Sequence, residues 1–157
     1  MLKNKWLSLI VWIIIFAIIA SLMGQITQAN LHPWYETLTK SNLTPPGIVF
    51  SITWTFLYII LAFIGWYLSQ DQNRHQLQPV YRLYLIQLLM NWAWTPLFFS
   101  FHYLGIAFLW LLVMCLLNIV IMLMLLNRHR FLAMLFLPYF VWLMFASYLN
   151  GFIWFYN

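Results

Sequence analysis

The chain has 157 residues, of which 66% are hydrophobic and only 6% are charged. Soluble proteins carry about 25% charged residues, so this composition excludes an ordinary soluble domain and indicates a membrane protein. The length leaves no room for a second domain, and we expect residues 1–157 to form one transmembrane domain. The formal net charge of +5 is spread over the segments that join the apolar stretches, which argues against a nucleic-acid partner.

Five long apolar stretches follow one another, and every charged residue lies outside them. They cover residues 6–26, 47–68, 83–101, 104–126 and 131–155. A helix needs about 20 apolar residues to cross a bilayer, and no stretch shows the alternation of a membrane β-strand. The sequence therefore predicts an all-α membrane protein with a bundle of five transmembrane helices. Residues 6–26 lack a clear cleavage site, so we expect a retained helix rather than a signal peptide.

The basic residues predict the orientation of this bundle. Six of the seven Lys and Arg residues lie on the side shared by the N-terminus, the second loop and the fourth loop, and only Lys40 lies on the opposite side. Because cytoplasmic loops carry the excess of basic residues, we expect the N-terminus in the cytoplasm and the C-terminus outside. We also expect the membrane to be a bacterial cell membrane.

Residues 27–46 form the one sizeable segment between spans, and the predicted orientation places them outside the cell. The sequence Thr44-Pro45-Pro46-Gly47 offers a capping hydroxyl followed by proline, which marks the start of the second helix. Most connections have about four to six residues, and longer ones are often lids or binding elements. We therefore expect this loop to act as a lid.

Polar side chains within the third stretch share one face. Gln87, Asn91 and Thr95 recur every fourth residue, so they stack along one side of a helix. Lipid offers such side chains no hydrogen-bond partner, so we expect this face to point toward other helices or a cavity. In the second stretch, Trp54 and Tyr58 are also one turn apart.

The fifth stretch repeats this arrangement with a small residue in its middle: Tyr139, Trp142, Ala146 and Asn150. The three faces together predict an aromatic, uncharged cavity in the outer half of the bundle, roofed by the loop, which suits a flat apolar ligand. Pro96 and Pro138 should kink their helices and open space, or serve packing alone. Plain packing also remains an alternative for Trp54, Trp142 and Asn91.

The spans lack the residues of acid, base or metal chemistry. All four histidines lie in loops or at span ends, Cys115 is the only cysteine, and no span contains Asp, Glu, Lys or Arg. This disfavours a haem or metal site and a proton-coupled transporter. A carboxylate-bearing ligand would need polar contacts at the cavity mouth, for which Lys40, His32 and His102 are the candidates.

Three segments resemble the TspO/MBR family, the tryptophan-rich sensory proteins related to the mitochondrial translocator protein or peripheral benzodiazepine receptor. They are Trp34-Tyr35-Glu36-Thr37-Leu38-Thr39-Lys40 with Thr44-Pro45-Pro46-Gly47 and Trp54-Thr55, then Asn91-Trp92-Ala93-Trp94-Thr95-Pro96-Leu97-Phe98-Phe99, and Pro138-Tyr139-Phe140-Val141-Trp142 through Ala146-Ser147-Tyr148-Leu149-Asn150. With the five predicted helices, the resemblance covers nearly the whole chain.

The resemblance implies a five-helix receptor, often a homodimer, that binds porphyrins such as protoporphyrin IX, isoquinoline-carboxamide and benzodiazepine drugs, and in some members cholesterol. The matching ligand-binding positions are Tyr35, Pro45, Trp54, Tyr58, Asn91, Trp94, Thr95, Trp142 and Ala146. Some bacterial members degrade protoporphyrin IX in light, which the resemblance assigns to Trp54 and Trp142 as catalytic residues. No cofactor is required, since the porphyrin is the ligand, and no metal site is expected.

Two departures from the family pattern concern the loop and cholesterol. Many members have proline where this chain has Ser41 and Thr53, which changes the expected path of the loop and the start of the second helix. The cholesterol pattern needs a basic residue after the tyrosine of the fifth helix, and none follows Tyr148. Cholesterol recognition is therefore unsupported.

Three functions remain open at this point. In the first, the cavity is that of a receptor, sensor or carrier that binds a tetrapyrrole by stacking on tryptophans. In the second, an excited porphyrin drives its own degradation beside the same indoles, because the spans supply no other reactive group. The third is a tetrapyrrole or lipid transporter, or a structural or partner-regulating membrane protein whose apparent cavity is core.

Overall fold

The structure is a computed structural model that describes residues 5–157, without the side chains of residues 71–76. It contains five long helices and two short π-helical turns, and no strand among the described residues. In chain order they are α1 (Lys5–Asn30), η1 (Leu31–Tyr35), α2 (Gly47–Ser69), α3 (Asp71–Thr95), η2 (Pro96–Ser100), α4 (Leu104–Arg128) and α5 (Arg130–Tyr156). The prediction of an all-α protein with five helices is confirmed.

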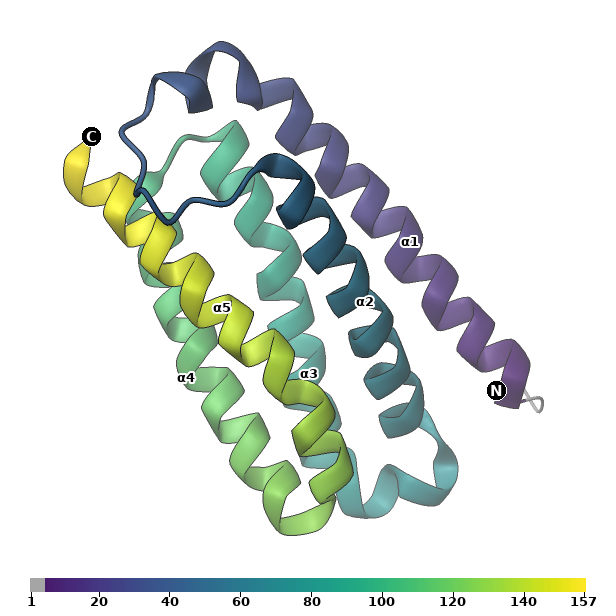
Figure 1. Ribbon diagram of the computed structural model, residues 1–157. Helices are drawn as coiled ribbons and strands as arrows, with labels where there is room; N and C mark the ends of the chain where they lie inside the picture. Colours follow the sequence, from purple (N-terminus) through teal and green to yellow (C-terminus); the bar gives the residue numbers. More distant parts are fainter. Residues whose placement is uncertain (1–4) are drawn as a thin grey trace.

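The helices lie side by side, each running opposite to the one before it (Figure 1). The pair α4 and α5 has the most extensive contact, α4 also packs on α3, and α2 packs on α1, α3 and α5. Helix α1 closes the bundle against α2, α3 and η2. This order places α2, α3 and α5 around a shared interior, which the predicted inward faces require.

Four helices of the described chain are long and apolar enough to cross a membrane: α1 together with η1, α2, α4 and α5. Helix α3 is not among them, although it lies beside the others in the bundle (Figure 1). The described part of α3 carries Gln78, Arg82, Gln87 and Asn91, which lower its hydropathy, and the last two are buried against neighbouring helices rather than turned to lipid. The predicted spans are therefore confirmed for four helices, and the fifth is present as a helix.

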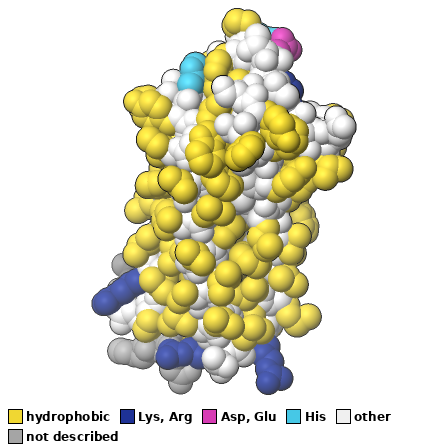
Figure 2. All heavy atoms as spheres, turned by 90° about the vertical axis from the view of Figure 1, so that its left-hand side faces the viewer, with side chains coloured by type: hydrophobic (Ala, Val, Ile, Leu, Met, Phe, Trp, Pro, Cys, Tyr) yellow, Lys and Arg dark blue, Asp and Glu magenta, His cyan; other side chains and the backbone are white. Residues whose placement is uncertain are grey.

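The exterior of the bundle is apolar, as a lipid environment requires. Hydrophobic side chains cover its middle, and Lys and Arg side chains gather at one end (Figure 2). We name this the basic end, and the opposite end, which carries residues 36–46, the loop end. Helix α1 is the most exposed of the five, because Phe16 is its only buried residue, while α5 buries nine. Lipid chains must therefore solvate most of α1.

Two helices extend further than hydropathy predicts. Helix α1 continues to Asn30, and α3 begins at Asp71, well before the apolar stretch that starts at residue 83. Polar turns can continue a helix beyond the hydrocarbon core because the helix satisfies its own backbone groups there as well. Hydropathy alone marks where a helix enters lipid, and not where it begins.

Pro96 and Pro138 have different effects on their helices. At Pro96 the α-helix gives way to the wider turn η2, which closes with a hydrogen bond from the backbone N–H of Phe101 to the carbonyl of Pro96 at 2.9 Å. His102 follows with a positive φ of 56°, and this reverses the chain toward α4. Pro138, by contrast, lies inside α5, which remains helical from Arg130 to Tyr156.

Candidate functional site

A chain of buried hydrogen bonds joins α2, α3 and α5. The hydroxyl of Tyr58 donates to Oδ1 of Asn91 at 3.3 Å, and Nδ2 of Asn91 donates to the hydroxyl oxygen of Tyr139 at 3.1 Å. The Tyr139 hydroxyl then donates to Oε1 of Gln87 at 2.8 Å. All four side chains are buried. The polar face predicted for the third helix thus points inward, and we name these four residues the polar chain.

A row of aromatic rings lies beside the polar chain. Phe50, Trp54 and Tyr58 follow one another at one-turn intervals on α2, and the rings of Trp54 and Tyr58 meet edge to face at 5.6 Å. From α5, Trp142 meets Phe50 edge to face, also at 5.6 Å. Trp54 and Trp142 therefore face the same part of the interior, and both pack against the same core cluster.

The indole N–H of Trp142 is buried and has no hydrogen-bond partner. The same holds for Nε2 of Gln87, at the end of the polar chain. A buried donor without an acceptor costs about 1–3 kcal/mol relative to one that is paired. The interior between α2, α3 and α5 therefore contains two donors that a bound polar atom could satisfy.

Trp94 and Tyr35 lie in a second cluster nearer the loop end. The indole N–H of Trp94 donates to Oδ1 of Asn150 on α5 at 3.1 Å, and its ring stacks on Phe98 at 5.3 Å. Tyr35 packs against Phe98 and Phe99 at 6.3 Å and 5.7 Å. The predicted ligand-binding residues are therefore divided between two clusters.

Three other predicted residues are placed less centrally. Thr95 is buried on α3, whereas Pro45 and Ala146 are half-buried. No hydrogen bond or ring contact links these three to the polar chain. Trp54, Tyr58, Asn91 and Trp142 are thus the predicted residues that the fold brings together most closely.

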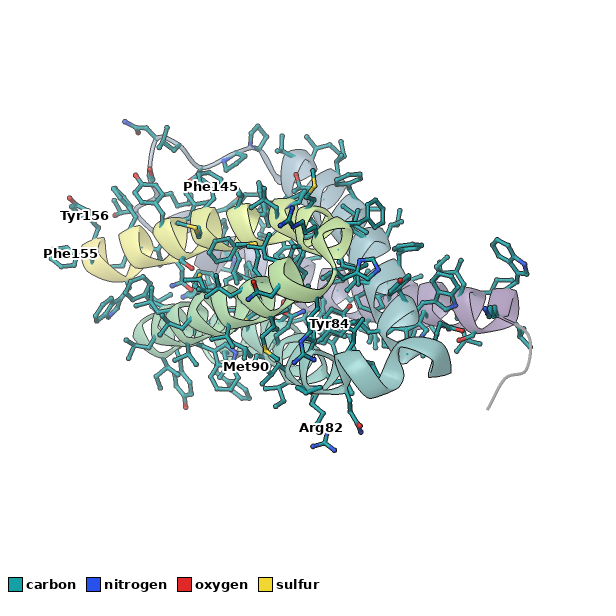
Figure 3. All side chains as sticks on the ribbon, turned by 90° about the horizontal axis from the view of Figure 1, so that it is seen from below. Arg82, Tyr84, Met90, Phe145, Phe155 and Tyr156 are labelled. Carbon is teal, nitrogen blue, oxygen red and sulfur yellow. The ribbon has the colours of Figure 1, made fainter. Side chains whose placement is uncertain are left out.

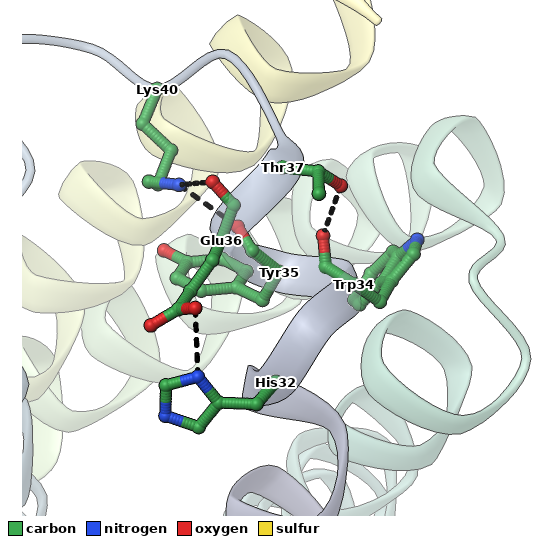
Figure 4. Close-up of polar contacts among 6 residues, drawn as sticks. All are labelled: His32, Trp34, Tyr35, Glu36, Thr37 and Lys40. Atoms are coloured by element: carbon green, nitrogen blue, oxygen red, sulfur yellow. Dashed lines mark hydrogen bonds and ion pairs between the residues drawn. The ribbon is translucent and has the colours of Figure 1, made fainter.

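The loop at residues 36–46 is organised around Lys40. Its ammonium donates to the backbone carbonyls of Tyr35 and Glu36 at 2.8 and 3.2 Å (Figure 4). It also donates to the carbonyl of Leu38 at 3.0 Å and lies 4.9 Å from the centre of the Tyr35 ring. Nδ1 of His32 lies 2.7 Å from Oε2 of Glu36, a contact that is an ion pair when the imidazole is protonated (Figure 4). These contacts occupy Lys40 and His32, so a ligand carboxylate would have to compete for them.

The loop is fastened to the end of α5 and to the turn before α4. The backbone of Thr39 donates to and accepts from the Asn157 side chain, at 2.8 and 3.1 Å. The hydroxyl groups of Ser41 and Tyr148 are 3.0 Å apart. The Trp34 ring stacks on His102 with 3.8 Å between the ring centres. The loop thus covers the end of the bundle, as a lid would.

Two surface hollows lie away from the aromatic row. The first is on α3 at the basic end, and the second lies between α4 and α5 near the loop end and is lined by Phe108, Leu112, Ser147, Tyr148, Gly151, Phe152, Trp154 and Phe155. Trp54 and Trp142 line neither of them. Both residues are half-buried.

The sequence patterns do not predict that Phe50 belongs to the aromatic row or that Ser41 holds the loop. Phe50 lies four residues before Trp54, so the helical spacing that marked Tyr58 could also have found it. Ser41 departs from the proline of the family pattern, and besides its contact with Tyr148 its hydroxyl accepts a hydrogen bond from the backbone N–H of Leu43 at 3.1 Å. Among the described residues, no group of three metal-ligating side chains occurs.

Comparisons with known proteins identify the family of the chain. The chain is 32% identical over 126 residues to a tryptophan-rich sensory protein of Cereibacter sphaeroides, covering 79% of this chain and 78% of the relative. It is 30% identical over 146 residues to the translocator protein of Sus scrofa, covering 88% and 86%. It is 27% identical over 124 residues to the tryptophan-rich protein TspO of Archaeoglobus fulgidus, covering 79% and 80%. The profile of the TspO/MBR family matches residues 10–155, and the chain belongs to that family.

Proposed function

We propose that this protein is a membrane receptor that binds porphyrins, such as protoporphyrin IX, and benzodiazepine-type ligands between α2, α3 and α5. The observation that carries the proposal is the aromatic row of Phe50, Trp54 and Tyr58, faced by Trp142 and bordered by buried polar groups. Flat conjugated rings stack on indole and phenol faces, and each such contact contributes about 0.5–1.5 kcal/mol beyond the burial of area. Membership of the TspO/MBR family supports the same ligand class.

Polar groups beside the row would orient the ligand. The unpaired indole N–H of Trp142 is a donor, and a carbonyl or ring nitrogen of a ligand would satisfy it. Asn91 lies on α3, with its amide held in a fixed orientation by Tyr58 and Tyr139. An uncharged site of this kind favours a flat ligand whose polar atoms lie at its rim.

The loop at residues 36–46 would act as the lid. Its contacts with α5 include the exposed pair of hydrogen bonds between Thr39 and Asn157, the bond between Ser41 and Tyr148, and the packing of Leu38 on the cluster that contains Ile153. An exposed hydrogen bond contributes about 0.5–1.5 kcal/mol at most, because water replaces it when it breaks. The lid can therefore open without disturbing the polar chain.

We further propose that the N-terminus lies in the cytoplasm of a bacterial cell and the loop lies outside it. The gathering of Lys and Arg at the basic end supports this orientation (Figure 2). The test is cysteine labelling of Lys40→Cys and Arg130→Cys in a Cys115→Ala background. Only the first should react with an impermeant reagent added to intact cells, and reaction of both would contradict the orientation.

Light-dependent degradation of the bound porphyrin is a second candidate, favoured by the position of two indoles on one side of the interior. Illumination of a porphyrin complex then gives faster loss of porphyrin absorbance than in protein-free controls. The loss slows in Trp54→Phe and Trp142→Phe. Equal bleaching in every sample would leave binding as the function and remove the enzymatic step.

Binding itself is tested by titrating purified protein with protoporphyrin IX and following the porphyrin absorbance. Trp142→Ala and Asn91→Leu should each weaken binding about tenfold, because each removes a contact worth about 1.4 kcal/mol. Trp154→Phe is the matched control, since Trp154 stacks on Phe108 away from the row. Wild-type affinity in both site variants would place the ligand elsewhere.

A further inference from the structure

A surface hollow on α3 at the basic end combines polar and apolar walls. It has a volume of about 420 Å³ and is lined by Gln78, Pro79, Arg82 and Leu83. Gln78 and Arg82 are one helical turn apart, as are Pro79 and Leu83, so a polar row lies beside an apolar row. Arg82 is exposed and points away from the bundle (Figure 3). Its guanidinium is therefore accessible to a partner from the membrane.

The electrostatic surroundings of the hollow are positive. Lys and Arg side chains gather at this end of the bundle (Figure 2). Helix α4 ends at Arg128 and α5 begins at Arg130. Glu36 is the only acidic side chain that the structure describes, and it lies at the loop end. Arg82 forms no ion pair with any described residue. The charge at this end thus favours an anionic partner.

Beyond Arg82, toward the middle of the membrane, the same face of α3 becomes apolar. One and two turns beyond Arg82 on the same face lie Ile86 and Leu89, whose exposed fractions are 49% and 64%. This surface has a guanidinium and an amide at one end and exposed aliphatic side chains along the rest. It therefore complements a lipid, which has a polar headgroup followed by apolar chains. The headgroup meets the polar end, and an acyl chain follows the apolar face.

We propose that this face of α3 is a binding site for an anionic phospholipid. The lipid phosphate accepts charge-assisted hydrogen bonds from the Arg82 guanidinium and a further bond from the Gln78 amide. One acyl chain lies along Ile86 and Leu89. A zwitterionic lipid binds more weakly, because its own ammonium group offsets the attraction of its phosphate to the basic end.

The test uses the full-length protein in a neutral detergent, titrated with phosphatidylglycerol or phosphatidylcholine of the same acyl chains, with bound lipid counted by native mass spectrometry. The wild type should prefer phosphatidylglycerol. Arg82→Gln should weaken phosphatidylglycerol binding about fivefold, the effect expected of one basic residue near an anionic headgroup. Arg82→Lys keeps the charge and should retain most of the preference.

The matched control is Arg130→Gln, which removes the same charge from the same end but not from the hollow. It should change the affinity by less than about twofold. Equal losses in Arg82→Gln and Arg130→Gln, or equal binding of the two lipids by the wild type, would overturn the site. Ile86→Gln should also weaken lipid binding, whereas glycerol phosphate at the lipid's concentration should not displace it. Full displacement, or no effect of Ile86→Gln, would overturn the docking of the acyl chain.

Discussion

The interior of the bundle and the loop over its end are held by the same kind of bond in opposite surroundings. In the interior, the Tyr139 hydroxyl bonds to Asn91 and Gln87 where all three side chains are buried. In the loop, Thr39 and Asn157 bond where water can replace either partner. A buried hydrogen bond leaves its donor and acceptor unpaired when it breaks, whereas water pairs with the groups of an exposed one. We therefore expect the interior to stay fixed and this attachment of the loop to break more readily.

The largest expected effect comes from removing the centre of the polar chain. Tyr139→Phe leaves Nδ2 of Asn91 and Oε1 of Gln87 without partners, which should lower the free energy of unfolding by about 1–3 kcal/mol. The lower half of that range is expected, because such bonds contribute less inside membranes. Unfolding by SDS titration in mixed micelles measures it. Tyr156→Phe at an exposed position is the control, and equal stability of both variants would contradict a fixed interior.

A smaller effect is expected from the centre of the loop. Lys40→Met removes the donor that holds three carbonyl groups, but water can solvate these carbonyls, so stability should fall by less than about 1 kcal/mol. The association rate of protoporphyrin IX should instead rise about fivefold, since a loop free to move uncovers the bundle more often. Stopped-flow absorbance measures this rate. An unchanged rate would mean that the ligand reaches the interior by another route.

Ser41→Ala tests a second contact that holds the loop. The change removes the bond to Tyr148 and the bond from the backbone of Leu43, and the association rate should rise about two- to threefold. Ser51→Ala is the matched control, because the Ser51 hydroxyl bonds only within α2, to the carbonyl of Gly47 at 3.3 Å. An equal rate increase in Ser51→Ala would contradict the prediction. It would show that the loss of any such hydroxyl raises the rate, and not the loss of the bond between the loop and Tyr148.

The smallest effect is expected at the end of the chain. Asn157→Ala removes both bonds to Thr39, which lie in solvent, so unfolding should change by less than about 0.5 kcal/mol. The loop should nevertheless become more accessible, which limited proteolysis between residues 36 and 46 would detect. Identical cleavage of variant and wild type would show that Ser41 and Lys40 alone hold the loop.

The faces of the helices could be predicted from spacing, but their partners could not. The four-residue repeat of Gln87, Asn91 and Thr95 marked an inward face, and all three are buried. Spacing within one helix, however, carries no information about which helix faces it. That Asn91 bonds to Tyr139, and Trp94 to Asn150, follows from packing α3 against its neighbours.

The same limit explains the division of the predicted site. Trp94 is three residues after Asn91, so the sequence places both on adjoining faces of one helix. The structure turns the Trp94 indole toward Asn150 and Phe98, because the widened turn η2 brings Phe98 back against it. Proline at position 96 predicted an interruption of the helix. The rings that the interruption would bring together could be seen only in three dimensions.

The exposure of α1 has a consequence for how the sequence can vary. In α1, the Trp12 ring packs closely on Gly65 and Phe16 packs on Tyr58 and Trp92. Exchanges among its exposed isoleucines and leucines leave this packing intact provided that they remain apolar. In α2, α3, α4 and α5, which bury more residues, a changed side chain more often meets another protein atom. Bilayer chemistry sets the rule for one part of this molecule, and steric fit sets it for the rest.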